Sequence, residues 1–366
     1  MLSAEGCRQR RQRFLQRLDP FPTEGFVLLA NHLHLMYLAN FHVDPFSLGS
    51  GFGGYLLLRK DGHATLIHDK RLPQSVQAAH VDEREVITWY DGQSPGQGPR
   101  EMDLREAVCK QLDARTFQPH DDPGRPDAPR VADALAAMRR QKDADELALQ
   151  MRCMRATDAG HAWARANIKP GMTELEVYCG VSGACSRAAG QAVIVYGDFA
   201  VSPGPERRGG PPTDRVLQPG DLFILDYSVV IGGYRSDFTN TLCVGKAPTA
   251  EQQWLFDLCL RALAAGENEL RAGAACLAVY QAVRGVFEKE GVADAFPHHA
   301  GHGLGLTHPE APFFVRHANE TLLENDVVTL EPGLYVAGVG GMRIERNYRV
   351  TGQSYETMSG HTIALQ

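Results

Sequence analysis

The stretch LFILDYSVVIGGYRSDFTNTLCV, residues 222–244, predicts a β-hairpin that carries two aspartates on one face. Gly232-Gly233 suits a two-residue primed turn, because both positions accept positive φ without a Cβ clash. With that turn, Asp226 faces Thr239, and Asp237 becomes its diagonal neighbour. Diagonal Cβ atoms lie about 7 Å apart or somewhat less, so both carboxylates can reach a shared cation.

Asp226 interrupts the apolar run LFILDYSVV. Burying a carboxylate without compensation costs several kcal/mol even after relaxation. A bound metal would remove that penalty, and so would an arginine. The hairpin by itself therefore leaves two alternatives open: a cation site, or an ordinary acid that pairs with Arg235 or stays solvated on an edge strand.

Three further candidate ligands follow along the chain. His302 lies between two glycines, Glu331 closes the apolar run of VVTLEPGLY, and Glu345 stands in GMRIERNYRVT, two residues after Arg343 on the same face. Four carboxylates and one imidazole carry too much negative charge for one divalent ion. They match two ions about 3.5 to 4 Å apart, bridged by carboxylates and a water.

Composition narrows the class of protein. With 366 residues, 43% hydrophobic and 22% charged, the chain is long enough for two globular domains. A net charge of −7 gives no general attraction to nucleic acid or anionic membranes, which favours a small-molecule or peptide partner. The N-terminal arginines precede no apolar signal core and no run of 18 apolar residues occurs, which predicts a cytoplasmic protein. The eight cysteines form no C-x-x-C pair and are expected to be reduced and packed as small hydrophobes.

The N-terminal part of the chain reads as strand-rich. Apolar runs predict strands at 26–30, 34–41 and 54–68, the last a hairpin around Lys60-Asp61-Gly62. Gly, Pro, Asp and Gln then accumulate over 93–128 and flank one helix near 103–114. We place a domain boundary near residue 135, which divides the chain into 1–135 and 136–366.

The C-terminal part combines helices with two strand-rich regions. The segment 142–168 has helical spacing of its apolar residues. Two capping-box signatures, Thr173 with Glu176 and Thr249 with Gln252, predict the starts of two more helices. Strands are expected over about 191–244 and 298–352.

The order Asp, Asp, His, Glu, Glu, within DYSVVIGGYRSDFTNT, HHAGHGLGL, TLEPGLY and GMRIE, resembles the pita-bread metallopeptidases: methionine aminopeptidase, aminopeptidase P, prolidase and creatinase. The segment MYLANFHVDP is similar to the accessory domain of the last three. The resemblance implies an α+β fold. A pita-bread domain over 136–366, a curved, mostly antiparallel sheet covered by helices, would follow a smaller α/β creatinase-like domain over 1–135.

The resemblance also implies roles for the five ligands. Asp226 would bind one metal, His302 and Glu331 the other, and Asp237 and Glu345 would bridge the two. We expect two divalent ions. The carboxylate-rich set favours Mn²⁺, with Co²⁺ or Zn²⁺ as alternatives.

The implied reaction is hydrolysis of a peptide C–N bond by a metal-bridging water, in an Xaa-Pro dipeptidase or aminopeptidase. Glu331 would take the proton from the water. His298 and His308 would hold the scissile group, and Arg343 completes the candidate catalytic set. Family members pair head to tail, which implies a homodimer. His32, His34 and His42 would then be structural or would border a partner's pocket.

Several positions depart from the peptidase pattern. Gly209 replaces a histidine, and Pro309 stands where a second histidine is usual, with His308 one place early. Arg346 replaces an aspartate, and Ser228 replaces the glycine of D-x-G. Two other functions therefore stay open: a creatinase-like amidohydrolase acting on a non-peptide bond, and a catalytically silent binding protein. The remaining histidines of this region are expected at the surface or in structural hydrogen bonds: His299 and His317.

Overall fold

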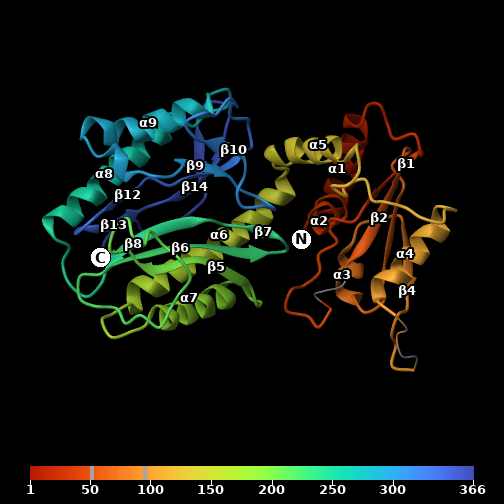
Figure 1. Cartoon of the computed structure of the whole chain (residues 1–366), viewed down its shortest axis with the longest axis horizontal. Coiled ribbons are helices and arrows are strands. Elements are labelled where there is room, and N and C mark those ends of the chain that lie inside the picture. Colours follow the sequence, from red (N-terminus) through yellow and green to blue (C-terminus); the bar gives the residue numbers. More distant parts are fainter. Residues whose placement is uncertain (50–52, 94–95, 97) are drawn as a thin grey trace. The chain divides into compact units, whose positions relative to one another are not determined.

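The computed structural model describes residues 1–49, 53–93, 96 and 98–366. The chain divides into two compact units, Met1–Arg139 and Arg140–Gln366. Figure 1 labels the helices and strands of each unit. The boundary predicted near residue 135 falls inside helix α5 (Ala128–Arg140). Part of the Gly- and Pro-rich stretch 93–128 lies outside the described residues. Among the described helices, none combines the length and the apolar character needed to cross a bilayer.

The N-terminal unit is built on one four-stranded sheet in the order β1-β2-β3-β4, in which only the β3–β4 pair is parallel. The strands are β1 Phe26–Leu29, β2 Gly54–Arg59, β3 Ala64–Asp69 and β4 Glu83–Ile87. The helices are α1 Ala4–Arg17, α2 His32–Ala39, α3 Pro73–Ala78 and α4 Arg100–Gln111. The predicted hairpin 54–68 and the predicted helix near 103–114 are confirmed.

The strand predicted at 34–41 is wrong, because this segment forms helix α2. Asn31 begins the helix, since its side chain accepts a hydrogen bond from the Leu33 amide at 2.9 Å. Asn40 ends it in the left-handed conformation, with φ of 53°. An apolar run of this length is compatible with a buried helix or with a strand. The capping residues at both of its ends stabilise the helix.

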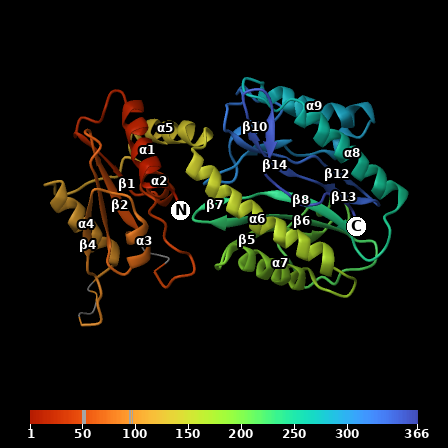
Figure 2. The ribbon, with the colours of Figure 1, turned by 180° about the vertical axis from the view of Figure 1, so that it is seen from behind.

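The C-terminal unit places two pairs of helices around its strands (Figures 1 and 2). Helices α6 and α7 pack on β5 and β6, whereas α8 and α9 pack on β13 and β10. The helices are α6 Ala144–Asn167, α7 Glu174–Ala189, α8 Ala250–Glu267 and α9 Cys276–Lys289. A short 3₁₀ turn, η1 (Ala293–Ala295), follows α9. This mixture of helices and mostly antiparallel strands confirms the predicted α+β class.

The strands of this unit form three groups. The first group is β5 Ile194–Val201, β6 Leu222–Ile231, β7 Tyr234–Arg235 and β8 Phe238–Cys243. The second has the order β10-β9-β11-β14-β15, and the third is the β12–β13 hairpin. Their bounds are β9 Gly301–Gly303, β10 Glu310–Phe314, β11 Val327–Leu330, β12 Gly333–Val336, β13 Gly340–Arg343, β14 Arg346–Val350 and β15 Tyr355–Thr357.

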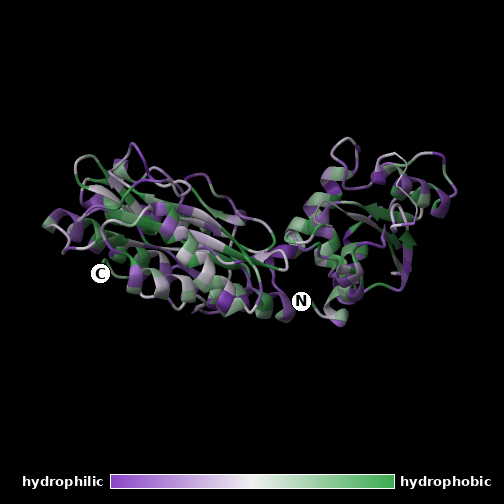
Figure 3. Cartoon of the chain, turned by 90° about the horizontal axis from the view of Figure 1, so that it is seen from below, coloured by the Kyte–Doolittle hydropathy of each residue, from purple (hydrophilic) through white to green (hydrophobic). Residues whose placement is uncertain are grey.

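Local sequence signals place several of these elements correctly. Gly232 and Gly233 have φ of 56° and 83°, and Asp226 pairs with Thr239, as the primed turn requires. Both predicted capping boxes form at the starts of α7 and α8. Figure 3 shows hydrophobic residues concentrated along the strands, whereas the helices carry both hydrophobic and hydrophilic residues.

Helix α6 approaches β6 closely at Gly160. A Cβ at this position would lie 2.2 Å from the Tyr227 hydroxyl and 2.7 Å from the Cys185 sulfur. We expect Gly160→Ala to lower the free energy of unfolding by about 1–3 kcal/mol through overpacking. Gly285→Ala in α9, where a Cβ meets nothing within 4 Å, should raise it by up to about 1 kcal/mol. Urea denaturation measures both; equal effects would contradict the packing described here.

Candidate metal centre

The five predicted ligands lie on or directly beside five strands. Asp226 lies on β6 and His302 on β9, whereas the other three directly precede or follow strands: Asp237, Glu331 and Glu345. All except Asp226 are buried, with exposed fractions of 8% or less. Ligand atoms lie within 4.8 Å of one another in three groups, of which the first and the third share Asp237: Asp237, His302 and His308; His298, His299 and Glu331; Asp226, Asp237 and Glu345.

His302 is oriented to offer one nitrogen to a cation. Its Nδ1 lies 2.9 Å from the Gly303 carbonyl, to which it can donate, so Nε2 keeps its lone pair. That Nε2 lies 3.6 Å from Asp237 Oδ2 and 3.5 Å from Glu331 Oε1. Burial lowers the pKa of His302, which favours the neutral imidazole that metal binding requires.

Glu345 is the strongest sign that the cluster is built for a cation. Thr239 donates to its Oε2 at 2.6 Å, but Oε1 is buried with no hydrogen-bond partner among the described residues. Burial, together with the neighbouring Asp237 and Asp226, raises the pKa of Glu345 well above its usual value. Burial likewise raises the pKa of Asp226 to about 7. Oxygen ligands that are this poorly compensated fit divalent ions.

Arg343 provides the only guanidinium contact of Asp226 among the described residues. Its Nη2 donates to Asp226 Oδ2 and to Asp198 Oδ2, and its Nη1 donates to the Tyr335 hydroxyl at 2.9 Å. The alternative partner Arg235 instead donates to the Leu306 carbonyl and the Tyr196 hydroxyl. Among the residues that the structure describes, a guanidinium thus contacts one of the four carboxylates, Asp226, and none contacts the other three.

The other two predicted catalytic histidines also reach this region. His308 Nε2 lies 2.7 Å from Asp237 Oδ2, so the one-residue shift along the chain still brings its ring to the cluster. Contact with Asp237 raises the pKa of His308 even though burial acts in the opposite direction. His298 Nε2 lies 3.4 Å from the Tyr335 hydroxyl, and burial lowers the pKa of His298 to about 4.

Two residues of this site were not predicted from the sequence. His299, expected at the surface or in a structural hydrogen bond, lies with Nδ1 3.2 Å from Glu331 Oε1. Asp198 was not considered, although it interrupts the apolar run IVYGDFAV of β5 just as Asp226 interrupts that of β6. Asp198 and Asp226 are directly paired across the two strands. The same signal, an acid inside an apolar strand, would have identified Asp198.

A small open cavity of about 250 Å³ adjoins the cluster. Carboxylates and imidazoles dominate its lining, and Arg343 provides the single guanidinium among the lining residues that the structure describes. Four of the five predicted ligands therefore face this space: Asp226, Asp237, His302 and Glu331.

A sequence model of metallopeptidase family M24 matches residues 149–352. The chain belongs to this family. The resemblance stated from the sequence is thereby confirmed for the C-terminal unit. An uncharacterized peptidase of Staphylococcus aureus (strain USA300) is 30% identical over 231 residues, which make up 62% of this chain and 64% of that protein. The chain thus spans less than two thirds of the length of this curated relative.

Solved structures of similar fold extend the match to both units of this M24 family member. An Xaa-Pro dipeptidase from Bacillus anthracis has a TM-score of 0.77 at 23% identity, covering 98% of this chain and 99% of that one. An X-Pro aminopeptidase from Thermotoga maritima has a TM-score of 0.77 at 21% identity, covering 97% and 98%. These similarities confirm the predicted pita-bread fold.

Proposed function

We propose that the chain is a dinuclear metallopeptidase that hydrolyses Xaa-Pro dipeptides. The observation that carries this proposal is the convergence of the predicted ligands beside an open cavity, with one Glu345 oxygen buried and without a hydrogen-bond partner in the described part of the chain. Asp226, Asp237, His302, Glu331 and Glu345 would hold two divalent ions, with Mn²⁺ the preferred metal. The bound ions would lower the pKa of a water and polarise the scissile carbonyl.

The protein's own groups have separate tasks in this reaction. Glu331, whose carboxylate lies next to the His299 and His302 rings, would accept the proton of the attacking water. His308 would donate a hydrogen bond to the substrate carbonyl. Arg343, which lines the cavity beside Asp226, would place a positive charge next to the substrate.

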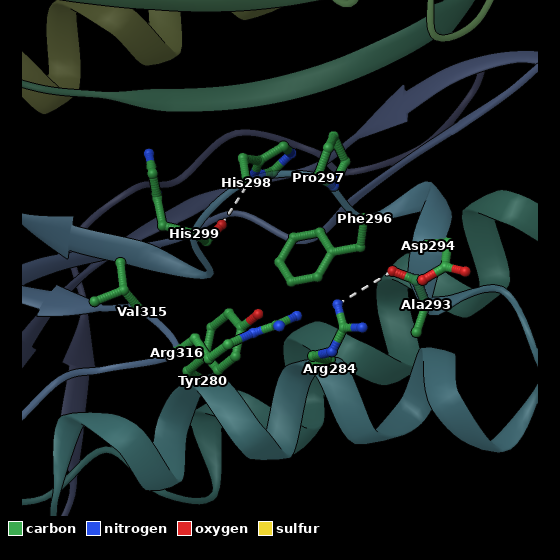
Figure 4. Close-up of a pocket in the computed structure, with 10 residues that line it drawn as sticks. All are labelled: Tyr280, Arg284, Ala293, Asp294, Phe296, Pro297, His298, His299, Val315 and Arg316. Atoms are coloured by element: carbon green, nitrogen blue, oxygen red, sulfur yellow. Dashed lines mark hydrogen bonds between the residues drawn. The ribbon is translucent and has the colours of Figure 1, made fainter.

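A second cavity supports a substrate with a free carboxylate. It has a volume of about 450 Å³ and shares His298 and His299 with the metal cluster. Figure 4 shows the guanidinium groups of Arg284 and Arg316 on the same side of the Phe296 ring. Arg284 also donates to Glu288 and to the Ala293 carbonyl, which leaves Arg316 as the better carboxylate partner. A dipeptide could place its proline ring against Phe296 and its carboxylate toward Arg316.

An assay on three peptides tests the proposal. We expect the Mn²⁺-loaded protein to cleave Ala-Pro, and to cleave Ala-Pro amide and Ala-Pro-Ala at least about tenfold less well, because a charged hydrogen bond contributes about 1.5–3 kcal/mol. Arg316→Ala should raise KM for Ala-Pro and reduce the preference for Ala-Pro over the amide and the tripeptide. Arg271→Ala, at an exposed arginine outside the cavity, should change neither the KM nor the preference. Absence of hydrolysis of all three peptides would contradict the proposal.

One observation favours a second candidate function, hydrolysis of a small non-peptide amide in the manner of creatinase. The place of the usual histidine is taken by Gly209, which lies directly against the Asp198 carboxylate. A cleft that is more anionic than in the peptidase pattern would suit a cationic substrate. Hydrolysis of creatine, but of no peptide, would select this alternative. The homodimer and the cytoplasmic location remain predictions.

A further inference from the structure

Asp198 lies outside the predicted ligand set but inside the same cavity. Its side chain is 29% exposed, its Oδ1 accepts a hydrogen bond from the Gly210 amide at 2.8 Å, and its Oδ2 accepts one from Arg343. A Cβ added at Gly209 would lie 2.0 Å from Asp198 Oδ2. The absence of a side chain at Gly209 therefore leaves the space that this carboxylate occupies.

Arg343 needs a second anion if Asp226 binds a metal. Its guanidinium is buried, with 8% of the residue exposed, and it is shared between Asp198 and Asp226. A cation bound to Asp226 would withdraw negative charge from this pair and add positive charge beside it. A buried charge that loses its partner is strongly destabilising, and Asp198 is the carboxylate that remains in contact.

We propose that Asp198 is a positioning residue for the metal centre. It retains Arg343 when the Asp226 carboxylate turns to a divalent cation, so that the arginine and the metal do not compete for Asp226. This inference rests on the metal site of the proposed function, but not on the identity of the peptide that is cleaved.

Calorimetric titration of the full chain with Mn²⁺, after a chelator has removed bound metal and has itself been removed, tests this role. Asp198→Asn keeps the shape of the side chain and removes its charge, so that Arg343 pairs with Asp226 alone. We expect the Mn²⁺ affinity to fall by about 10- to 100-fold, the range for groups that orient metal ligands. Asp257→Asn, at an exposed position on α8, is the matched control and should leave the affinity unchanged.

A double-mutant cycle separates positioning from a simple loss of negative charge. In an Arg343→Gln background, Asp198→Asn should change the Mn²⁺ affinity by less than about twofold, because no guanidinium remains to be held. An equal loss in both backgrounds, or no loss in either, would overturn the proposal. Gly209→Ala, which displaces the Asp198 carboxylate without removing it, should weaken binding as Asp198→Asn does, and thermal melting verifies that each variant is folded.

The titration of the wild-type chain separates a failure of the role proposed for Asp198 from a failure of the proposed metal site. If the wild-type chain binds two Mn²⁺ and Asp198→Asn binds them equally well, only the role of Asp198 fails. If the wild-type chain binds no Mn²⁺, the proposed function fails and the role of Asp198 fails with it.

Discussion

Asp237→Asn is expected to abolish stoichiometric metal binding and to lower kcat/KM for Ala-Pro by at least about 10³-fold, since metal ions contribute several kcal/mol to transition-state stabilisation. Asp237 belongs to two of the three ligand groups. Its carboxylate contacts His308 at 2.7 Å and the Ser228 hydroxyl at 3.4 Å. No other described residue belongs to two ligand groups. A neighbouring side chain therefore cannot replace Asp237 as a ligand.

Metal content and peptide hydrolysis are measured on the same preparation of Asp237→Asn. Asp257→Asn serves again as the control, because its carboxylate accepts a hydrogen bond from Gln253 on the exposed face of α8. A variant that retains both metals and more than one tenth of the activity would show that Asp237 is not a bridging ligand.

Glu345→Gln is expected to change stability in opposite directions with and without metal. Burial raises the pKa of Glu345 in the folded chain. The metal-free wild type therefore loses stability as pH rises above the unfolded value of about 4.3 and through the folded-state pKa. The amide of Glu345→Gln does not ionise, so the variant does not lose stability over this pH range. At pH 7.5 with chelator, it should be about 1–3 kcal/mol more stable than wild type, in the range found when buried charges are replaced.

Saturating Mn²⁺ reverses this order. Binding to the folded state alone stabilises wild type by about 4 kcal/mol at 1,000 times Kd, and a variant without the Glu345 ligand gains less. Urea denaturation with chelator and with Mn²⁺ measures both cases. A substitution that destabilises the chain equally in both conditions would mean that Glu345 stabilises the fold without a metal.

The parts of the site that follow from local chemistry could be predicted from the sequence. The Gly232-Gly233 turn sets the register of its hairpin, and that register places Asp226 and Asp237 on one face. The strand predicted at 34–41 failed for an equally local reason, since the caps at Asn31 and Asn40 were not recognised.

The position of Asp198, and the choice between Arg343 and Arg235 as the partner of Asp226, depend on contacts between distant segments. Asp198 reaches the site only because β5 pairs with β6 in a register that places it opposite Asp226. The selection of Arg343 over Arg235 as the partner of Asp226 depends on the path of β13, which approaches β6 from another group of strands. No local pattern encodes either contact.

Paired cations are expected to neutralise the buried acids of this site. Elemental analysis of the full chain, after incubation with Mn²⁺ and removal of free metal by gel filtration, measures this. We predict close to two Mn²⁺ per wild-type chain and almost none for Asp237→Asn. A wild-type chain that emerges folded and without metal would contradict the account, because its acidic cluster would then be stable without the ions.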